Sequence, residues 1–226
     1  MVSVKRLAIC FMVFAMVFSS TVFGEVSDAT KLNELGIVKT NELSSNLSTP
    51  VKKVDAYMSF IRLIGFESIA KKYNGKLIYK DSKSFPSDKA AAINYSRYNK
   101  ELSLWIKKGD VFSCNSTITI EEYMRHLLKA LGYQQGKDYS DILLFSKGIG
   151  LISEADVKIG KKSVTTGDFY RITINSLRTK RKDGKVFSVF LSEKKILSDS
   201  VVKKYKLNDP DSDLENFDIE AEEGGE

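Results

Sequence analysis

The sequence predicts an all-α protein built from three similar helix–loop–helix repeats, and two observations support this prediction. The first is apolar spacing. Counted from an acidic residue, positions one, two, six and nine are apolar or aromatic in three segments, as on one face of a helix. The second is a helix-start signal in front of that face. The three acids are Asp55, Glu122 and Asp168. Because small repeated units bury their apolar faces against one another, we expect a pseudo-threefold helical bundle.

The starts of the three expected helices differ. Thr119 and Thr165 each stand three residues before the acid of their own segment, which is the spacing of a capping box. An acid in the first turn also complements the positive end of the helix dipole. Lys52 occupies the cap position of the first segment, so we expect that helix to begin more weakly.

Each repeat also contains an expected upstream helix. The three candidates are residues 28–36, 88–99 and 138–148, and the first is expected to stop at Gly36. The middle repeat carries an insertion, in which residues 102–106 are expected to form a short strand. A basic turn at 178–185 is followed by one further packed helix at 186–197.

The first residues have the order of a secretory signal. Lys5 and Arg6 precede an apolar run at 7–18, and small residues lead to an expected cleavage point after Gly24. The alternative is an uncleaved membrane anchor, for which a run of twelve is short. We therefore divide the chain into a signal peptide (1–24), repeat one (25–74), repeat two (75–137), repeat three with a closing helix (138–207) and an acidic, disordered tail (208–226).

The charge is unevenly distributed. The whole chain has 35 basic and 29 acidic residues, a formal net charge of +6. The tail at 208–226 contains nine acids and no base, so residues 25–207 carry 33 bases against 20 acids. A body this cationic suits an anionic partner.

The composition argues against most enzyme and metal classes. One His and two Cys are too few for a structural zinc site, and removal of Cys10 with the signal would leave Cys114 alone, as a buried small hydrophobe. The sequence contains no nucleophile elbow, phosphate loop or His-Glu-x-x-His. A calcium-loop spacing begins at Asp209, but Leu214 stands where the loop needs glycine. We expect no catalytic residue, no cofactor and no metal.

The motifs resemble S-layer homology repeats. The best copy runs from 112 to 122 and continues to a Leu-Gly ending at 131–132. Further matches are residues 32–37 and 63–65 in the first copy, and residues 164–168 and 175–177 in the third. The resemblance covers about residues 26–177.

This resemblance implies a cell-wall anchor: a helical spindle whose grooves hold an anionic, often pyruvylated, polysaccharide. It makes the motif residues the candidate ligand-binding set: Lys52, Lys53, Asp55, Thr119, Glu122, Thr165 and Asp168. The family's motif arginine is replaced by Lys53, Ile120 and Thr166. Only Lys53 keeps a cation, and a lysine lacks the bidentate fork that suits a carboxylate.

We therefore expect a secreted, non-catalytic carbohydrate-binding protein at the cell wall or surface of a Gram-positive type bacterium. Its partner would be an anionic secondary cell-wall polymer or an envelope protein. Nucleic acid is not an expected partner, and a membrane is one only through an uncleaved signal segment. The alternatives are a protein–protein interaction or structural envelope or spore module, and a small cell-wall hydrolase.

Several motif residues also have simpler interpretations. Glu122 and Asp168 would act only as helix caps, and Lys52 and Lys53 would only form a solvated helix start. The motif tyrosines are expected in the core or a groove wall rather than on a sugar-stacking platform: Tyr57, Tyr123 and Tyr170. The basic turn at 178–185 would be a solvated loop, or would meet an anionic polymer or the chain's own tail.

Overall fold

The computed structural model describes residues 27–75, 79–99, 102 and 111–210. Within these ranges the chain is mostly helical, and its β structure is limited to isolated bridges, which confirms the all-α prediction. The helices are α2 (Asp28–Glu34), α3 (Lys53–Leu63), α4 (Glu67–Lys71), α5 (Ala90–Tyr95), α6 (Ile120–Ala130), α7 (Ile142–Gly148), α8 (Glu154–Lys158), α9 (Thr166–Arg178), α10 (Phe187–Glu193) and α11 (Asp199–Lys204), with 3-10 turns η1 (Thr40–Glu42) and η2 (Ser82–Ser84).

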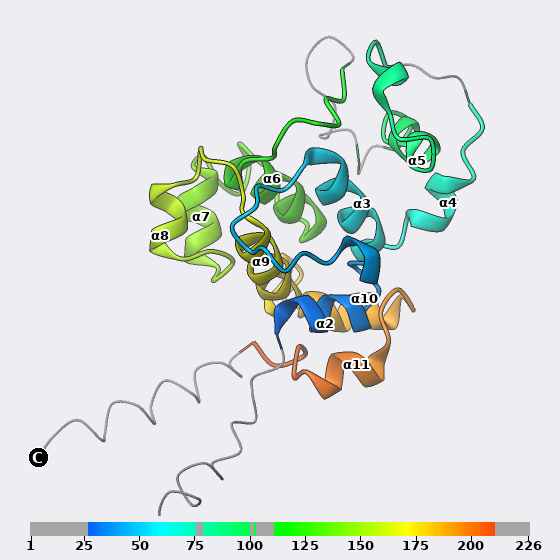
Figure 1. Cartoon of the computed structure of the whole chain (residues 1–226). Coiled ribbons are helices and arrows are strands. Elements are labelled where there is room, and N and C mark those ends of the chain that lie inside the picture. The colour runs from blue at the N-terminus through cyan, green and yellow to red at the C-terminus, as the bar shows by residue number, and fades with distance from the viewer. Residues whose placement is uncertain (1–26, 76–78, 100–101, 103–110, 211–226) are drawn as a thin grey trace, which may run out of the picture.

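The longer helices are central and the shorter ones peripheral. Helices α3, α6 and α9 carry the predicted apolar faces and lie in the middle of the molecule (Figure 1). Short helices pack around them in pairs: α4 with α5, α7 with α8, and α10 with α11. Helix α2 packs on α9 and lies beside α10 and α11.

The segments in front of the three central helices join in a closed cycle of backbone hydrogen bonds. Val51 N–H donates to the Val164 carbonyl (2.9 Å), Val164 N–H donates to Ile118 (2.8 Å), and Ile118 N–H donates to Val51 (3.2 Å). A second cycle in the opposite sense links Lys53 to Ser116 (2.7 Å), Ile120 to Lys162 (3.3 Å) and Thr166 to Thr49 (2.8 Å). We call residues 49–53, 116–120 and 162–166 the motif ring.

The three central helices begin as their sequences predict. The Thr119 hydroxyl accepts from Glu122 N–H (3.1 Å), and the Glu122 carboxylate accepts from Thr119 N–H (3.0 Å), which completes a capping box. The Thr165 hydroxyl likewise accepts from Asp168 N–H (3.2 Å). Lys52, in front of α3, makes no side-chain cap hydrogen bond. The prediction of one weaker start is confirmed.

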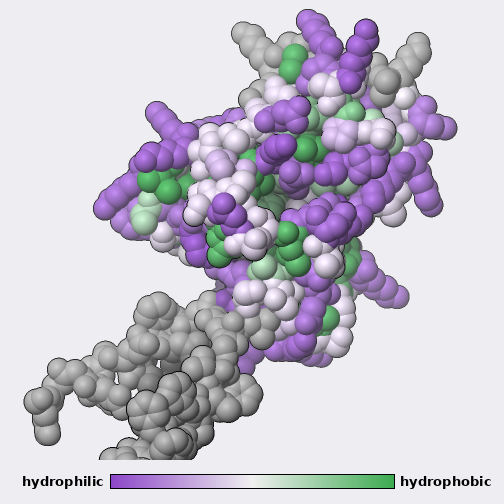
Figure 2. Space-filling view, viewed as in Figure 1, coloured by the Kyte–Doolittle hydropathy of each residue, from purple (hydrophilic) through white to green (hydrophobic). Residues whose placement is uncertain are grey.

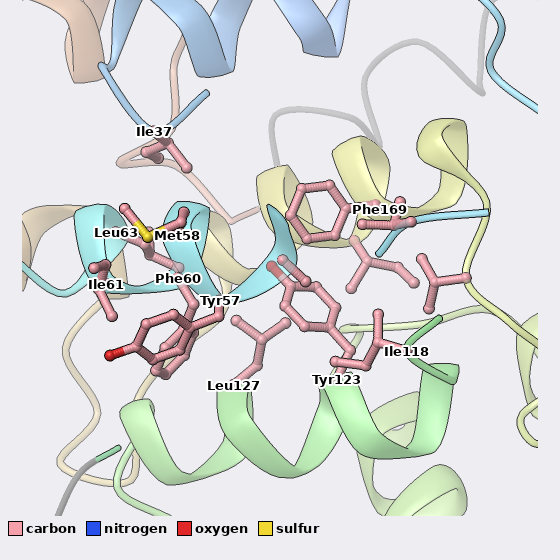
Figure 3. Close-up of a cluster of buried hydrophobic side chains, with 14 of the residues drawn as sticks. Ile37, Tyr57, Met58, Phe60, Ile61, Leu63, Ile118, Tyr123, Leu127 and Phe169 are labelled. Carbon is pink, nitrogen blue, oxygen red and sulfur yellow. The ribbon is translucent and has the colours of Figure 1, made fainter. Parts of the chain in front are cut away.

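The predicted apolar faces form the core. Figure 3 shows Tyr123 and Leu127 of α6 pointing toward the α3 side chains, with Phe169 of α9 beside them. The ring centroids of Tyr123 and Phe169 are 5.0 Å apart. Burying a side chain of this size contributes about 1.5–3 kcal/mol. These contacts stabilise the packing of α3, α6 and α9 against one another next to the motif ring.

The motif tyrosines are buried and hydrogen-bonded. The Tyr57 hydroxyl donates to the Ala92 carbonyl (2.7 Å), and the hydroxyls of Tyr123 and Thr173 are 2.8 Å apart. The Tyr170 hydroxyl accepts from Ser44 N–H (3.3 Å). Their predicted place in the core or in a groove wall is confirmed.

Left-handed residues end several helices. Helix α2 stops before Gly36 (φ +72°), as predicted. Gly65 (φ +79°) follows α3, and a Cβ there would lie 2.8 Å from the Ile196 side chain. The packed helix expected at 186–197 is present as α10 but is shorter than predicted, because Lys195 (φ +58°) turns the chain after it; α11, which follows at Asp199, was not predicted. The helix expected at 88–99 is shorter than predicted, and α4 and α8 were not predicted.

Other sequence predictions lie partly or wholly outside the described residues. This holds for the signal peptide at 1–24, for 103–106 of the expected strand and for the tail beyond Pro210. Leu102, the described part of that strand, is a buried turn residue. No helix within the described ranges has the length and apolar character that crossing a membrane requires.

Candidate functional site

A polar groove of about 640 Å³ lies beside the motif ring, lined by residues within 38–71, 86–89 and 166–170. We call it the motif groove. Six of its lining residues belong to the ring or to the candidate set, namely Thr49, Pro50, Val51, Lys52, Asp55 and Thr166. Its other charged lining residues are Lys39, Glu42, Arg62, Lys71, Asp88 and Lys89.

Arg62 is the anchor of the groove wall. Its side chain is 5% exposed, and its two terminal nitrogens donate to the two carboxylate oxygens of Glu42 at 2.5 and 2.8 Å. Its Nε donates to Glu67 (2.9 Å) and its Nη1 to the Ile37 carbonyl (3.1 Å). A planar, bidentate pair of this kind fixes geometry as well as charge. Arg62 therefore holds η1 and α4 against α3.

Glu67 forms ion pairs with several basic side chains beside it. Burial alone would raise its pKa, but hydrogen bonds from Lys71 and Arg62 hold the pKa of Glu67 at about 2. Lys71 lies 2.9 Å and Lys39 3.2 Å from the same carboxylate oxygen. Lys89, on the other side of the groove, pairs with Asp55 at 2.9 Å.

Lys52 differs from these cations. Its side chain is exposed at the motif ring, and it has no ion-pair partner among the described residues. Its backbone faces Thr117 in an isolated bridge, so the ring fixes the place from which the side chain extends. Among the described residues, the motif groove therefore offers one unpaired ammonium to a ligand, while its other cations pair with neighbouring acids.

The side chain of Lys53, unlike that of Lys52, is buried. The residue is 5% exposed, and its ammonium lies 5.1 Å from the centroid of the Phe112 ring, as in a cation–π contact. Ile120 and Thr166, at the equivalent ring positions, are also buried. The Thr166 hydroxyl donates to the Thr49 carbonyl (2.9 Å). The three residues that the resemblance aligns with a motif arginine are thus all buried.

The remaining candidate residues stabilise helix starts. Thr119, Glu122, Thr165 and Asp168 form the caps described above. Asp168 also accepts from Arg171 (3.0 Å), which makes two further bonds to the buried Asp156 at 2.7 and 3.0 Å. Asp156 in turn caps α8 through Ser153. The structure thus gives these candidates capping partners and brings only Lys52 and Asp55 to the motif groove.

The sequence analysis missed the Arg62 network. Glu42 lies twenty residues before Arg62 in a turn with no repeat signature, so no local spacing connects the two. Arg62 and Glu67 are five residues apart, whereas side chains that pair along a helix are three or four residues apart. Only the turn at Gly65 brings Glu67 back to Arg62.

The remaining reactive residue types are buried. Cys114 is 1% exposed, and burial and the nearby Asp81 raise its pKa to about 11, so its thiol stays protonated and inert. Burial, followed by the charges of Lys53, Arg125 and Lys129, lowers the pKa of His126 well below its usual range. Within the described residues, no three His, Cys, Asp or Glu side chains form a group that could hold a metal ion.

A comparison with protein-family models finds no match to this chain, and a comparison with curated proteins finds none either. The resemblance to S-layer homology repeats stays a prediction that rests on the motifs themselves.

Proposed function

We propose that this chain is an exported, non-catalytic protein of the cell envelope, in which three S-layer-homology-like repeats form a pseudo-threefold bundle. We further propose that the motif groove binds an anionic wall polysaccharide. The observation that carries the proposal is the placement of an exposed, unpaired lysine, Lys52, on the motif ring at the edge of that groove.

The closed hydrogen-bond cycles support the repeat arrangement. Val51, Ile118 and Val164 occupy the same position relative to the three motif acids, and each donates to one copy and accepts from the other. The positions two residues later repeat the pattern in the opposite sense. Equivalent positions that make equivalent bonds are what repeated units around a common axis would produce.

The chemistry of the groove supports an anionic ligand with many hydroxyl groups. Its lining is largely polar, and the hydroxyls and amide of Ser44, Asn41 and Thr49 lie along it with Lys52. An ammonium binds a carboxylate or phosphate as a point charge and tolerates several orientations. The excess of bases over acids in residues 25–207 would draw such a polymer to the surface.

Co-sedimentation of the chain from residue 25 onward with purified, peptidoglycan-linked wall polymer tests the proposal. We expect Lys52→Glu to lower the bound fraction about fivefold at low salt, the effect of roughly 1 kcal/mol. Lys137→Glu makes the same charge change on an exposed lysine outside the groove and should change binding less than twofold. If the unaltered chain does not sediment with any polymer preparation, polysaccharide binding is refuted.

The second candidate is an interaction module that binds an envelope protein. It is favoured by the internal pairing of Arg62, Lys39, Lys71 and Lys89, which leaves little free charge for a polymer. Against it, the face drawn in Figure 2 is mostly hydrophilic, with hydrophobic residues in scattered patches. Sedimentation with envelopes that persists after chemical removal of the polymer would support this candidate, and release of soluble sugars or muropeptides would instead indicate a hydrolase.

A further inference from the structure

A second hollow, of about 880 Å³, lies at the opposite ends of the central helices. We call it the aromatic cleft. The ends of α3 and α6 form one side, and α10 with the basic turn before it forms the other. The residues on which the argument depends are Arg125, Lys129, Arg181, Lys194, Tyr133 and Phe190.

The cleft is positively charged. Four basic side chains line it, and none of the described residues that line it is acidic. Arg125 pairs with Glu121 (3.1 Å) and Arg181 with Asp183 (3.0 Å), and both acids lie outside the lining. An anion that enters the cleft therefore meets cations and no like charge.

The cleft is also apolar and aromatic. The guanidinium of Arg181 lies 3.5 Å from the centroid of the Phe190 ring, and the ammonium of Lys194 lies 5.8 Å from it. Phe187, Leu191 and Ile196 continue the apolar wall. A ligand that fits this lining carries negative charge and large apolar groups together, which is the chemistry of an acidic peptide with spaced hydrophobic residues.

The chain contains such a segment. Residues 208–226 hold nine acids and no base, and Leu214, Phe217 and Ile219 stand among the acids. The chain enters this segment next to α10, because the buried Leu207 accepts a hydrogen bond at its carbonyl from the hydroxyl of Ser188 (2.7 Å). Ser188 belongs to the helix that supplies Phe190 to the cleft.

The distances are favourable. Phe217 lies ten residues after Leu207, so the chain between them can span up to about 33 Å when extended. Helix α10 has seven residues and is about 10 Å long. A segment tethered this closely has an effective concentration in the millimolar range.

We propose that residues 211–226 bind in the aromatic cleft of the same chain, with their carboxylates on the four cations and with Leu214 and Phe217 against the rings. The interaction joins a positively charged cleft to a negatively charged segment, so the attraction weakens as the salt concentration rises. It uses no residue of the motif groove and does not depend on polysaccharide binding.

Paramagnetic relaxation measured by NMR tests the proposal in the chain from residue 25 onward. A nitroxide on Ser212→Cys marks the tail, since the buried Cys114, with its raised pKa, does not compete for the label. We expect the amide signals of Gly132 and Lys194 to broaden at least twice as strongly as that of Lys158, which lies in α8 away from the cleft. Equal broadening at all three amides would overturn the proposal.

Three variants separate specific binding from general attraction. Lys194→Glu, an exposed position that should not disturb folding, is expected to reduce the excess broadening at the cleft by at least half. Phe217→Ser should do the same, and Lys161→Glu, a matched charge reversal on an exposed lysine after α8 and outside the cleft lining, should leave it unchanged. An equal loss in Lys194→Glu and Lys161→Glu would refute the cleft as the binding site.

A mixture of isotope-labelled chains with separately spin-labelled chains shows whether the tail in the cleft belongs to the same chain or to a second copy. Broadening in the mixture as strong as in the doubly labelled chain would show that the tail of a second copy fills the cleft, and this would overturn the intramolecular proposal. A failure of polysaccharide binding would leave all of these expected results unchanged.

Discussion

The motif groove and the aromatic cleft are lined by similar numbers of basic side chains but use them differently. In the groove, Arg62, Lys39 and Lys71 converge on the carboxylates of Glu42 and Glu67. In the cleft, none of the lining residues that the structure describes is an acid. A count of lysines and arginines therefore does not measure the charge that is available to a ligand, because charges that face each other are already used to hold the fold.

The comparison predicts losses of stability of unequal size for two arginine substitutions. Arg62→Met should lower the free energy of unfolding by about 3 kcal/mol, because it removes the bidentate partner of the partly buried Glu42 and one of the partners of Glu67. Arg181→Met should cost about 1 kcal/mol or less, since it loses one ring contact and one exposed acid. Urea unfolding followed by circular dichroism measures both, and equal losses would contradict the contrast.

The groove should also make stability depend on pH. Because folding lowers the pKa of Glu67 from 4.5 to about 2, this carboxylate stabilises the fold fully above its unfolded pKa and loses that contribution as the pH falls through 4.5 toward 2. We expect a loss of about 2 kcal/mol from this group after solvent screening. Glu67→Gln should remove that part of the slope, and an unchanged slope in the variant would assign it to other groups.

The smallest expected effects concern the helix starts. Thr119→Ala removes the α6 cap and should cost about 1 kcal/mol. Lys52→Thr supplies the missing cap of α3 and should gain about 0.5 kcal/mol, while it removes the ammonium proposed to bind polymer. Stability and sedimentation should therefore move in opposite directions in Lys52→Thr, and thermal melts of both variants beside the unaltered chain provide the measurement.

Features encoded over a few residues could be predicted from the sequence. The apolar faces follow from side-chain spacing. The start of α6 is indicated by Thr119 and Glu122, which lie within four residues of each other. The fifth residue after each motif acid also lies on the buried face, although it is not apolar in the third segment. Thr173 stands where the other copies have Phe60 and Leu127, and it fits there because its hydroxyl bonds both Tyr123 and the Phe169 carbonyl.

Features that depend on distant parts of the chain could not be predicted. Arg62 finds Glu42 only after the chain has folded back, and the aromatic cleft combines residues of α3, α6 and α10. The inward orientation of Lys53 is equally non-local, since Phe112, the ring it faces, belongs to the next repeat. The sequence therefore located the helix starts to which the candidate residues belong, but the spacing of residues did not reveal which of their side chains are exposed.

The cycle through Val51, Ile118 and Val164 also sets an order of events. Each of its bonds joins segments far apart in the chain, and the cycle cannot close until the third segment is present. Contacts of such long range slow folding, because loop-closure entropy is lost before the core compensates for it. A polypeptide that crosses a membrane through a narrow channel has to stay unfolded on the way. In the export that we propose, the ring could not close before residues 162–166 had been delivered, so the residues ahead of them would cross without a closed ring.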